Sequence, residues 1–210
     1  MIKRLMDIIL SIFGLIVAAP LFIVLAVLIK RDSPGPVFYR QIRVGKNGKL
    51  FKIFKFRTMV QNADKIGGPS TSGDDMRVTN IGKIIRKYNF DELAQLISVL
   101  RGEMSLVGPR PEVPIYVNLF TEEEKQILSV LPGITDWACI WNPDEGSLLA
   151  GSIDPEKVYL EKIRPEKIRL QLKYVRKHNI WVDIQILFLT LKVHFFAPIF
   201  GIKQLPDNMA

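Results

Sequence analysis

The longest apolar stretch of the chain covers residues 8–29 and contains no charged residue. A helix of this length is able to cross the hydrocarbon core of a bilayer. Basic residues flank the stretch on both sides, Lys3 and Arg4 before it and Lys30 and Arg31 after it. Since basic residues favour the cytoplasmic side of a membrane, the flanks favour the same side for both ends of the helix.

Pro20 lies near the middle of this stretch, where a proline bends or breaks a helix. A break there lets the chain enter the cytoplasmic leaflet and return, which satisfies both basic flanks. We therefore predict a re-entrant helix-break-helix over residues 1–31 as a membrane anchor, and a domain over residues 32–210 at the cytoplasmic face. A straight transmembrane helix that tolerates the proline is the alternative. A cleaved signal peptide fits less well, because Ala18-Ala19-Pro20 is a poor cleavage site.

Two extended segments follow the predicted anchor. Residues 37–44 and 50–59 are rich in β-branched and aromatic residues, and the Asn47-Gly48 pair between them is a strong hairpin signal. In the second segment Lys55 and Arg57 alternate with phenylalanines. This pattern is typical of a solvated edge strand, of a surface that contacts phosphates or lipid headgroups, or of an RNA-binding surface. The anchor directly upstream favours phosphate or membrane contact, so we expect no nucleic acid as a partner.

Residues 61–75 lack hydrophobic periodicity and have the composition of a loop, either a lid over a site or an idle connection. Helical spacing returns over residues 78–88, with isoleucines on one side of the predicted helix and basic residues on the other. The isoleucines are Ile81, Ile84 and Ile85. Arg86 belongs to the basic side, which we expect to face the segment that follows.

The next helical pattern is an apolar stripe formed by Leu93, Leu96, Ile97 and Leu100. This spacing predicts an amphipathic helix that packs on a core through the stripe. Gly102 ends the helix, and Asn89 with Glu92 is typical of a capping box at its start. Asp91 and Glu92 then lie in the first helical turn, where acidic residues are common because they offset the positive end of the helix dipole.

Arginines give the same stretch a functional interpretation. Arg86 upstream and Arg110 downstream are placed to bind one phosphate near the helix N-terminus. Prolines on both sides of Arg110 make its loop stiff. A carboxylate beside clustered arginines suits a site where the carboxylate attacks phosphorus or holds a divalent cation. Asp91 and Glu92 are therefore candidate catalytic residues as well as candidate helix-capping residues.

Composition agrees with a membrane-surface protein that has an anionic partner. The formal net charge of +8 and the pI of about 9.6 fit either nucleic acid or the negatively charged cytoplasmic leaflet. The mean hydropathy of +0.17 is high for a chain with 24% charged residues, because the apolar excess is concentrated in the anchor. The single cysteine, Cys139, excludes an internal disulfide and fits a reducing compartment.

Five short motifs occur in order along the chain: F-K-I-F-K-F-R-T-M, G-K-I-I-R, D-E-L-A-Q-L, G-E-M-S-L-V-G-P-R-P and L-P-G-I-T. Together with the proline-broken anchor they closely resemble the bacterial sugar transferases known as monotopic phosphoglycosyl transferases. The resemblance covers nearly the whole chain. No multi-pass segment precedes the anchor in this sequence, so the resemblance implies the small form of the family.

The resemblance implies a transfer reaction at the cytoplasmic face of the bacterial plasma membrane. In this family the aspartate of the Asp-Glu pair, here Asp91, attacks the β-phosphate of a nucleotide-activated sugar, for which we expect a UDP-sugar. Nucleoside monophosphate leaves and a covalent aspartyl phosphosugar remains. Polyprenyl (undecaprenyl) phosphate then attacks this intermediate, which yields a polyprenyl diphosphate sugar, the first lipid-linked intermediate of a glycan pathway.

The same resemblance implies Mg²⁺ as a cofactor, because cations must screen the charge of a carboxylate that approaches a diphosphate. Asp91 and Glu92 are the expected metal ligands, and Glu92 either binds the metal or orients the pair. The resemblance assigns phosphate contact to Arg86 and Arg110. The basic pattern of the second extended segment adds a set of candidate phosphate-binding residues, Lys55 and Arg57.

Two positions depart from the commoner pattern of the family. Asp136 stands where many relatives have glycine, and the region around it is a candidate determinant of nucleotide or sugar choice. Ala19 precedes Pro20 where relatives often have a serine that bonds back into the broken helix. These departures bear on details of the kink and of the substrate.

The C-terminal part of the chain is predicted to be helical. Beyond residue 151 two charged helices are separated at Pro165, and their charges form a solvated face. Residues 180–196 are nearly all apolar, and Trp181 with several phenylalanines suits a helix in the membrane interface or against the core. His178 and His194 lack metal-ligand spacing and receive no chemical role.

These observations predict an α/β membrane-associated single domain with a re-entrant N-terminal helix, a β-hairpin and amphipathic interfacial helices. The rival interpretation is a non-enzymatic basic membrane adaptor, which would not require Asp91. A nucleic-acid binder with a membrane tether is a more distant alternative, and salt-dependent RNA binding without turnover would support it.

Overall fold

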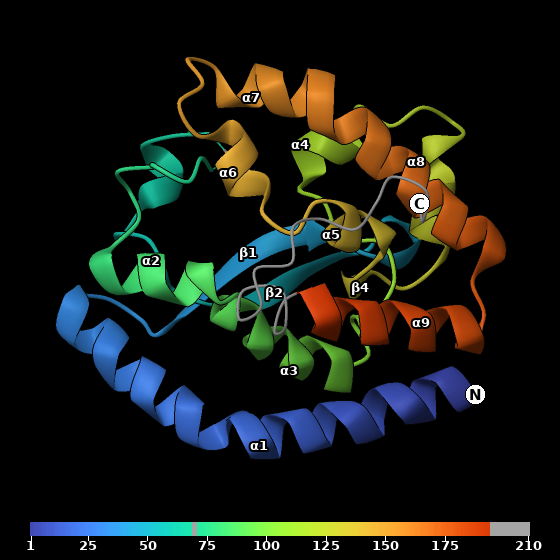
Figure 1. Cartoon of the computed structure of the whole chain (residues 1–210), viewed down its shortest axis with the longest axis horizontal. Coiled ribbons are helices and arrows are strands. Elements are labelled where there is room, and N and C mark those ends of the chain that lie inside the picture. The colour runs from blue at the N-terminus through green and yellow to red at the C-terminus, as the bar shows by residue number, and fades with distance from the viewer. Residues whose placement is uncertain (69–70, 194–210) are drawn as a thin grey trace.

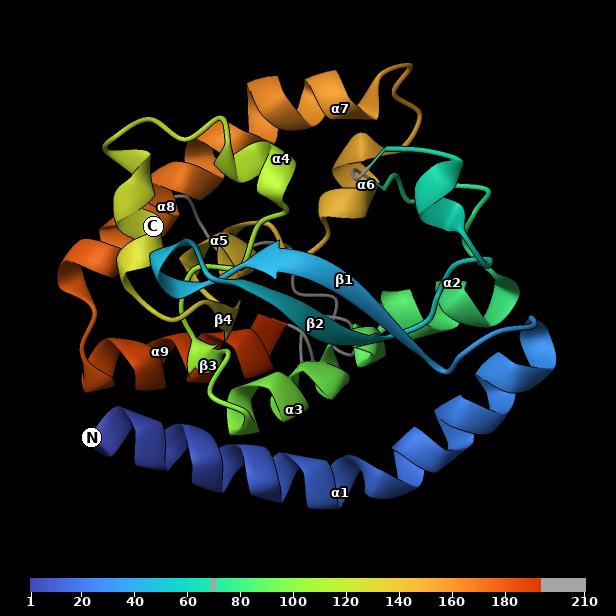
Figure 2. The ribbon, with the colours of Figure 1, turned by 180° about the vertical axis from the view of Figure 1, so that it is seen from behind.

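Helix α1 (Ile2–Asp32) lies along one edge of the molecule, and the other elements are stacked on one side of it (Figure 1 and Figure 2). The structure is a computed structural model that describes residues 1–68 and 71–193. Pro20 lies inside α1, and the helix continues through it as one element. The predicted break is therefore wrong: α1 bends in its middle (Figure 1) but stays helical. A proline removes one main-chain N–H, while the neighbouring turns keep their hydrogen bonds.

Strands β1 (Phe38–Val44) and β2 (Leu50–Phe56) pair antiparallel. A short 3-10 helix (Lys46–Gly48) connects them. Asn47 and Gly48 have positive φ angles of 56° and 76°, a conformation that asparagine and glycine tolerate better than other residues. β2 ends before residue 59, so the second strand is shorter than the sequence predicts.

A second, parallel pair of strands was not predicted. β3 (Ser105–Val107) pairs with β4 (Gly133–Thr135), and each is too short to show an alternating pattern. Just after β3 the main chain approaches the first residue of β4 closely, since a Cβ atom on Gly133 would lie 2.1 Å from the main-chain nitrogen of Gly108. Only glycine permits this approach, which leads directly into residues 109–111.

Helix α2 (Asn80–Lys87), a 3-10 helix (Phe90–Ala94) and helix α3 (Gln95–Leu100) follow one another along the chain. Gly102 has a φ of 77°, so α3 ends at a left-handed glycine as predicted. The predicted isoleucine face of α2 is only partly right, because Ile84 is exposed. These three elements lie beside α1 and β2 (Figure 1).

The buried face of α3 differs from the predicted apolar stripe. Leu96 is the one stripe residue that is buried, whereas Gln95 and Ser98 are fully buried. α3 lies between α1 and the strands β2 and β3, so both of its faces are covered (Figure 1). Leu96 packs on α1 at Gly14, where a Cβ atom would lie 3.0 Å from its Cδ1. A stripe predicted from one sequence does not identify the deeper face when a second helix covers the other side.

The remaining described helices are a 3-10 helix (Ala63–Lys65), α4 (Pro114–Val117), a 3-10 helix (Glu124–Ser129), α5 (Trp137–Trp141), α6 (Glu145–Leu149), α7 (Pro155–Val158), α8 (Arg164–Lys177) and α9 (Ile180–Leu191). A π-helical turn (Tyr159–Ile163) joins α7 to α8. Pro165 therefore does not separate two helices but occupies the first turn of α8, where its missing N–H is tolerated. The predicted end of the last helix at residue 196, and His194, lie outside the described residues.

Polar contacts fasten both ends of α1 to the rest of the chain. Near its start, Arg4 donates from Nη1 to the carbonyl oxygen of Val99 at 2.6 Å, and Asp7 accepts from the main-chain N–H of Leu106 at 3.1 Å. At its end, Asp32 accepts from a main-chain N–H of α2 at 3.1 Å. Helix α1 is thus bound along its length instead of projecting away.

A buried cluster joins the start of α1 to α8 and α9. Lys3 pairs with Asp183 at 2.6 Å, and the hydroxyl of Tyr174 donates to the same carboxylate at 2.7 Å. Lys3 and Tyr174 also donate to the carbonyl oxygen of Val107, at 3.0 and 3.2 Å. Asp183 is 1% exposed, so these contacts satisfy a carboxylate that has left water.

Candidate active site

The Asp-Glu pair lies in the 3-10 helix between α2 and α3, and the predicted capping box is wrong. Asn89 has a φ of 54°, and its side chain makes no cap hydrogen bond. Its carbonyl oxygen instead accepts from the main-chain N–H of Glu92 at 3.2 Å. The Glu92 carboxylate points to basic side chains, not back to Asn89. The acidic pair is therefore positioned for contacts outside its own helix.

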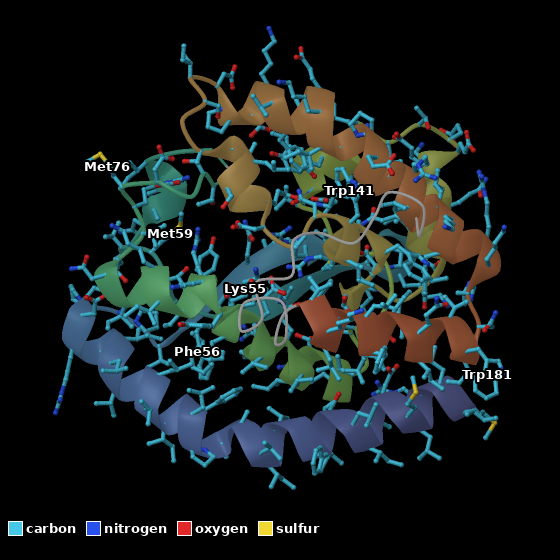
Figure 3. All side chains as sticks on the ribbon, viewed as in Figure 1. Lys55, Phe56, Met59, Met76, Trp141 and Trp181 are labelled. Atoms are coloured by element: carbon cyan, nitrogen blue, oxygen red, sulfur yellow. The ribbon has the colours of Figure 1, made fainter. Side chains whose placement is uncertain are left out.

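Two basic residues converge on the pair from different elements. Lys55, on β2 near the middle of the view in Figure 3, lies with Nζ 3.6 Å from Asp91 Oδ2 and 3.4 Å from Glu92 Oε1. Arg110 donates from Nη1 to Glu92 Oε2 at 2.6 Å and from Nη2 to Glu92 Oε1. The sequence-predicted residues Asp91, Glu92, Lys55 and Arg110 are thus brought together.

The two carboxylates have opposite electrostatic environments. Burial raises the pKa of Asp91 above its ordinary value, and the negative charge of Glu92 adds to this, while Lys55 partly opposes it. Burial alone would raise the pKa of Glu92 too, but Arg110 and Lys55 hold it well below its ordinary value. Glu92 therefore stays ionised, and Asp91 is the more basic carboxylate of the pair.

Arg86 lies close to the pair but forms no bidentate hydrogen bonds with either carboxylate. Its Nε donates to the hydroxyl of Thr58 at 2.9 Å. Burial lowers the pKa of Arg86, and the charges of Asp91 and Asp75 oppose that shift. Thr58 was not predicted, although it follows directly on the basic strand. Arg86 keeps its place as a candidate phosphate-binding residue because its charge faces Asp91.

Arg57 is a correction to the predicted site. It is 6% exposed, and its guanidinium donates to the carbonyl oxygens of Ser33 at 2.7 Å and Pro34 at 2.6 Å. These carbonyls follow the end of α1, so Arg57 fixes the connection between α1 and β1. A guanidinium engaged by main-chain oxygens in this way is not available to a substrate phosphate. The alternating pattern of β2 could not distinguish this inward residue from Lys55.

Asp136 does not lie on the surface of the site. It is 0% exposed and caps α5 by accepting from the main-chain N–H of Cys139 at 2.8 Å. A fully buried carboxylate cannot touch a nucleotide or a sugar directly. The neighbouring carbonyl of Ile134 accepts from Arg110 Nη1 at 3.1 Å, a contact that no sequence motif indicates.

The carboxylates of Asp91 and Glu92 fit a magnesium site whose remaining ligands come from substrate and water. Among residues 1–68 and 71–193, no group of three or more His, Cys, Asp or Glu side chains lies together. Mg²⁺ in phosphoryl-transfer sites takes one or two carboxylates, and phosphate oxygens and water supply its other ligands. Asp91 and Glu92 meet that requirement. Both oxygens of Glu92 are engaged by Arg110, whereas the described residues show no bidentate arginine contact to Asp91.

The chain is similar in sequence to a known family and to several characterised proteins. The sequence profile described as Bacterial sugar transferase matches residues 1–197. A UDP-N-acetylgalactosamine-undecaprenyl-phosphate N-acetylgalactosaminephosphotransferase of Aeromonas hydrophila is 39% identical over 194 residues, which cover 91% of this chain and 43% of the relative. An undecaprenyl-phosphate glucose phosphotransferase of Komagataeibacter xylinus is 42% identical over 202 residues, covering 93% and 36%.

A third relative is the UDP-glucose:undecaprenyl-phosphate glucose-1-phosphate transferase of Escherichia coli (strain K12), which is 37% identical over 201 residues, covering 91% of this chain and 39% of the relative. The chain therefore spans about two fifths of the length of these three relatives. The profile match covers nearly the whole chain, and it shows that the chain belongs to the bacterial sugar transferase family.

Proposed function

We propose that this protein transfers a sugar-1-phosphate from a nucleotide sugar to polyprenyl phosphate, with Asp91 as the nucleophile. The observation that carries the proposal is the difference between two adjacent carboxylates. Asp91 is buried and has a raised pKa, whereas Arg110 fixes Glu92 as an anion. The names of the relatives support undecaprenyl phosphate as the acceptor and a UDP-sugar as the donor.

The proposed reaction has two displacements at phosphorus. In the first, an oxygen of Asp91 attacks the β-phosphorus of the donor, the bond to the bridging oxygen breaks, and nucleoside monophosphate leaves with that oxygen. An aspartyl phosphosugar remains. In the second, a phosphate oxygen of polyprenyl phosphate attacks the same phosphorus, and the Asp91 carboxylate leaves. The product is a polyprenyl diphosphate sugar, and Asp91 is regenerated.

The cations around the pair account for how two anions can approach each other. Lys55 lies within 3.6 Å of both carboxylates, and it can shift from them to a phosphate oxygen. Arg110 comes from the loop after β3 and Arg86 from helix α2, so a diphosphate beside Asp91 meets positive charge from more than one side. Glu92 keeps Arg110 in place between turnovers.

We include Mg²⁺ in the proposal, with Asp91 and Glu92 as its protein ligands. When bound, the ion neutralises part of the phosphate charge and holds the diphosphate in line with the attacking oxygen. Asp91 and Glu92 would hold the ion, and Glu92 would also orient the pair through its contacts with Arg110. Loss of activity on chelation and recovery on adding Mg²⁺ are the expected results.

We also propose that α1 is a re-entrant anchor at the cytoplasmic face. The helix is long and apolar enough to cross a membrane by length and composition. Yet both of its ends bind the same body, through Arg4 and Asp7 at one end and Asp32 at the other. A spanning helix would separate these ends by the thickness of the bilayer and break one set of contacts.

A second apolar surface supports seating on the leaflet. Exposed side chains on one face of α9 form a stripe, namely Trp181, Ile184, Phe188 and Leu191. Trp181 lies at the outer edge of the molecule close to the start of α1 (Figure 3). An amphipathic helix with a tryptophan suits the headgroup level, where the phosphate of the lipid acceptor lies.

The test is replacement of the nucleophile. Asp91→Asn keeps size but cannot form the acyl phosphate, so turnover should collapse while the protein stays folded and membrane-bound. Release of nucleoside monophosphate is measured with UDP-glucose and UDP-N-acetylgalactosamine, polyprenyl phosphate and Mg²⁺. Asp154→Asn is the matched control, because Asp154 only caps α7, accepting from Lys157 at 3.0 Å.

Trapping supplies the second measurement. Wild-type protein is incubated with Mg²⁺ and a nucleotide sugar that is labelled in its sugar, without lipid. The label should then be found on Asp91. Adding polyprenyl phosphate should remove it. A folded Asp91→Asn variant that retains substantial turnover overturns the covalent mechanism.

A further inference from the structure

Asp136 lies behind the active site, at the point where β4 ends and α5 begins. It is fully buried. Its Oδ2 accepts from the main-chain N–H of Arg110 at 3.2 Å and from Nε2 of Gln171 at 3.2 Å, while Oδ1 accepts from the main-chain N–H of Cys139 at 2.8 Å. Within the described part of the chain it makes no ion pair, so three neutral N–H groups hold its charge.

The contact with Arg110 is unusual because of the loop that carries it. Pro109 and Pro111 have no N–H, so the N–H of Arg110 is the one main-chain donor in residues 109–111. Asp136 accepts a hydrogen bond from that N–H. The side chain of the same arginine reaches forward to Glu92, and its main chain is therefore held from behind.

We propose that Asp136 is a positioning residue that sets the place of Arg110 through its main chain. The inference rests on the proposed function, in which Arg110 faces the transferring phosphate. Asp136 touches neither substrate nor phosphorus, and acts only by fixing the backbone from which the guanidinium extends. The electrostatics agree: although burial alone would lower it, Glu92 raises the pKa of Arg110 well above its ordinary value, and Cys139 and Asp136 add to that rise.

A positioning role predicts a particular kinetic signature. A guanidinium that is displaced slightly still attracts a diphosphate, so the KM for the donor should change little. Stabilisation of the charge that develops during transfer depends more steeply on position. The rate constant kcat should therefore carry most of the loss.

Asp136→Asn is a selective probe because of what surrounds the residue. The asparagine oxygen can still cap α5 at Cys139. Its amide can donate to Gln171 once the side-chain amide of Gln171 turns over, which brings Oε1, buried without a hydrogen-bond partner in the described structure, to face residue 136. Only the N–H of Arg110 then faces another N–H. Asp136→Ser is the second variant, since serine also caps helices but is too short to reach Arg110.

The first measurement is amide hydrogen exchange in the full-length protein held in lipid nanodiscs. Between two prolines, the amide of Arg110 dominates the signal of residues 109–111. We expect faster exchange there in both variants and unchanged exchange in Asp154→Asn, which alters the cap of α7 instead. Unchanged exchange at Arg110 in both folded variants would overturn the proposal, whatever the activity.

The second measurement is turnover. We expect Asp136→Asn to lower kcat roughly ten- to a hundredfold with the donor KM within about threefold of wild type. In an Arg110→Lys background the same substitution should cost much less, because Asp136 acts through Arg110. Additive losses would contradict that coupling. If the wild type turns over no nucleotide sugar, the proposed function fails, and the exchange result still decides the positioning role.

Discussion

Arg110 donates hydrogen bonds to both carboxylate oxygens of Glu92, from Nη1 to Oε2 at 2.6 Å and from Nη2 to Oε1. The preceding residue, Asp91, has no such fork and lies 3.6 Å from the ammonium group of Lys55. A bidentate guanidinium fixes a carboxylate in both position and charge. The two neighbours therefore differ: Glu92 is a fixed anion, and Asp91 is a buried carboxylate with a raised pKa.

The bidentate pair between Arg110 and Glu92 predicts that Glu92→Gln destabilises the protein. An amide accepts through one oxygen only, so one nitrogen of Arg110 would lose its partner in a largely buried site. We expect the free energy of unfolding to fall by about 1–3 kcal/mol. Glu166→Gln is the control, because Glu166 pairs with Arg169 at the surface at 2.6 Å. Denaturant titration should show a much smaller change there, and equal changes would contradict a special role for the fork.

The raised pKa of Asp91 predicts the acid limb of the pH profile. Burial is the main cause of the shift, and the attacking carboxylate must be ionised. Turnover should therefore fall on acidification at a pH above the ordinary range of an aspartate, while Glu92, with its lowered pKa, stays ionised. The logarithm of kcat/KM plotted against pH measures this limb. A limb at the ordinary aspartate value would show that Asp91 is not perturbed.

The same shift predicts that Asp91→Asn stabilises the protein. Because the folded-state pKa is raised, the folded state favours protonated Asp91. Its contribution to stability is complete below the unfolded-state pKa and is lost as the pH rises through the folded-state pKa. The neutral asparagine avoids this loss, so the variant should melt at a higher temperature than wild type at pH 7. The difference should vanish in acid, and a lower melting temperature at pH 7 would refute the argument.

The attachments of α1 predict the sidedness of two labels. Cysteines placed at Lys3 and at Gly45 in a Cys139→Ala background should both react with an impermeant reagent from the cytoplasmic side only. Lys3 lies at the start of α1, and Gly45 lies in the connection between β1 and β2, beyond the end of α1. Labels on opposite sides would replace the re-entrant interpretation with a spanning helix.

The close approach of Gly108 and Gly133 predicts a strict requirement for glycine at residue 133. In Gly133→Ala the new methyl group would lie 2.1 Å from the nitrogen of Gly108, so the strands must separate. We expect a loss of about 1–3 kcal/mol and weaker turnover, because residues 109–111 would shift. Gly146→Ala is the control, since its nearest neighbours stand 3.6 Å away. Thermal melts and turnover should distinguish the two.

Local patterns predicted several residues that the structure brings together at the candidate site. Asp91 and Glu92 were found from their setting between arginines, and Arg110 from its prolines. What failed depended on partners far along the chain. Arg57 matched the basic pattern of Lys55, but the carbonyls that bind it belong to the end of α1. The link between Asp136 and Gln171 spans two elements that no pattern connects.

Secondary structure followed the same division. The strands β1 and β2 are long enough for their β-branched and aromatic residues to be recognised in the sequence. The shorter strands β3 and β4 form only because they pair with each other, next to the close approach of Gly108 and Gly133. The buried face of α3 was predicted wrongly because α1 covers its apolar side. In each case the missing information was the identity of a distant neighbour.

The attachment of Lys3 to Asp183 bears on how the protein is made. Lys3 is synthesised well before its partner in α9, since α1 precedes α9 along the chain. The proposed anchor therefore has to settle in the leaflet without the contacts that later retain it. We expect a chain that stops before α9 to be membrane-bound already, while the start of α1 remains unattached.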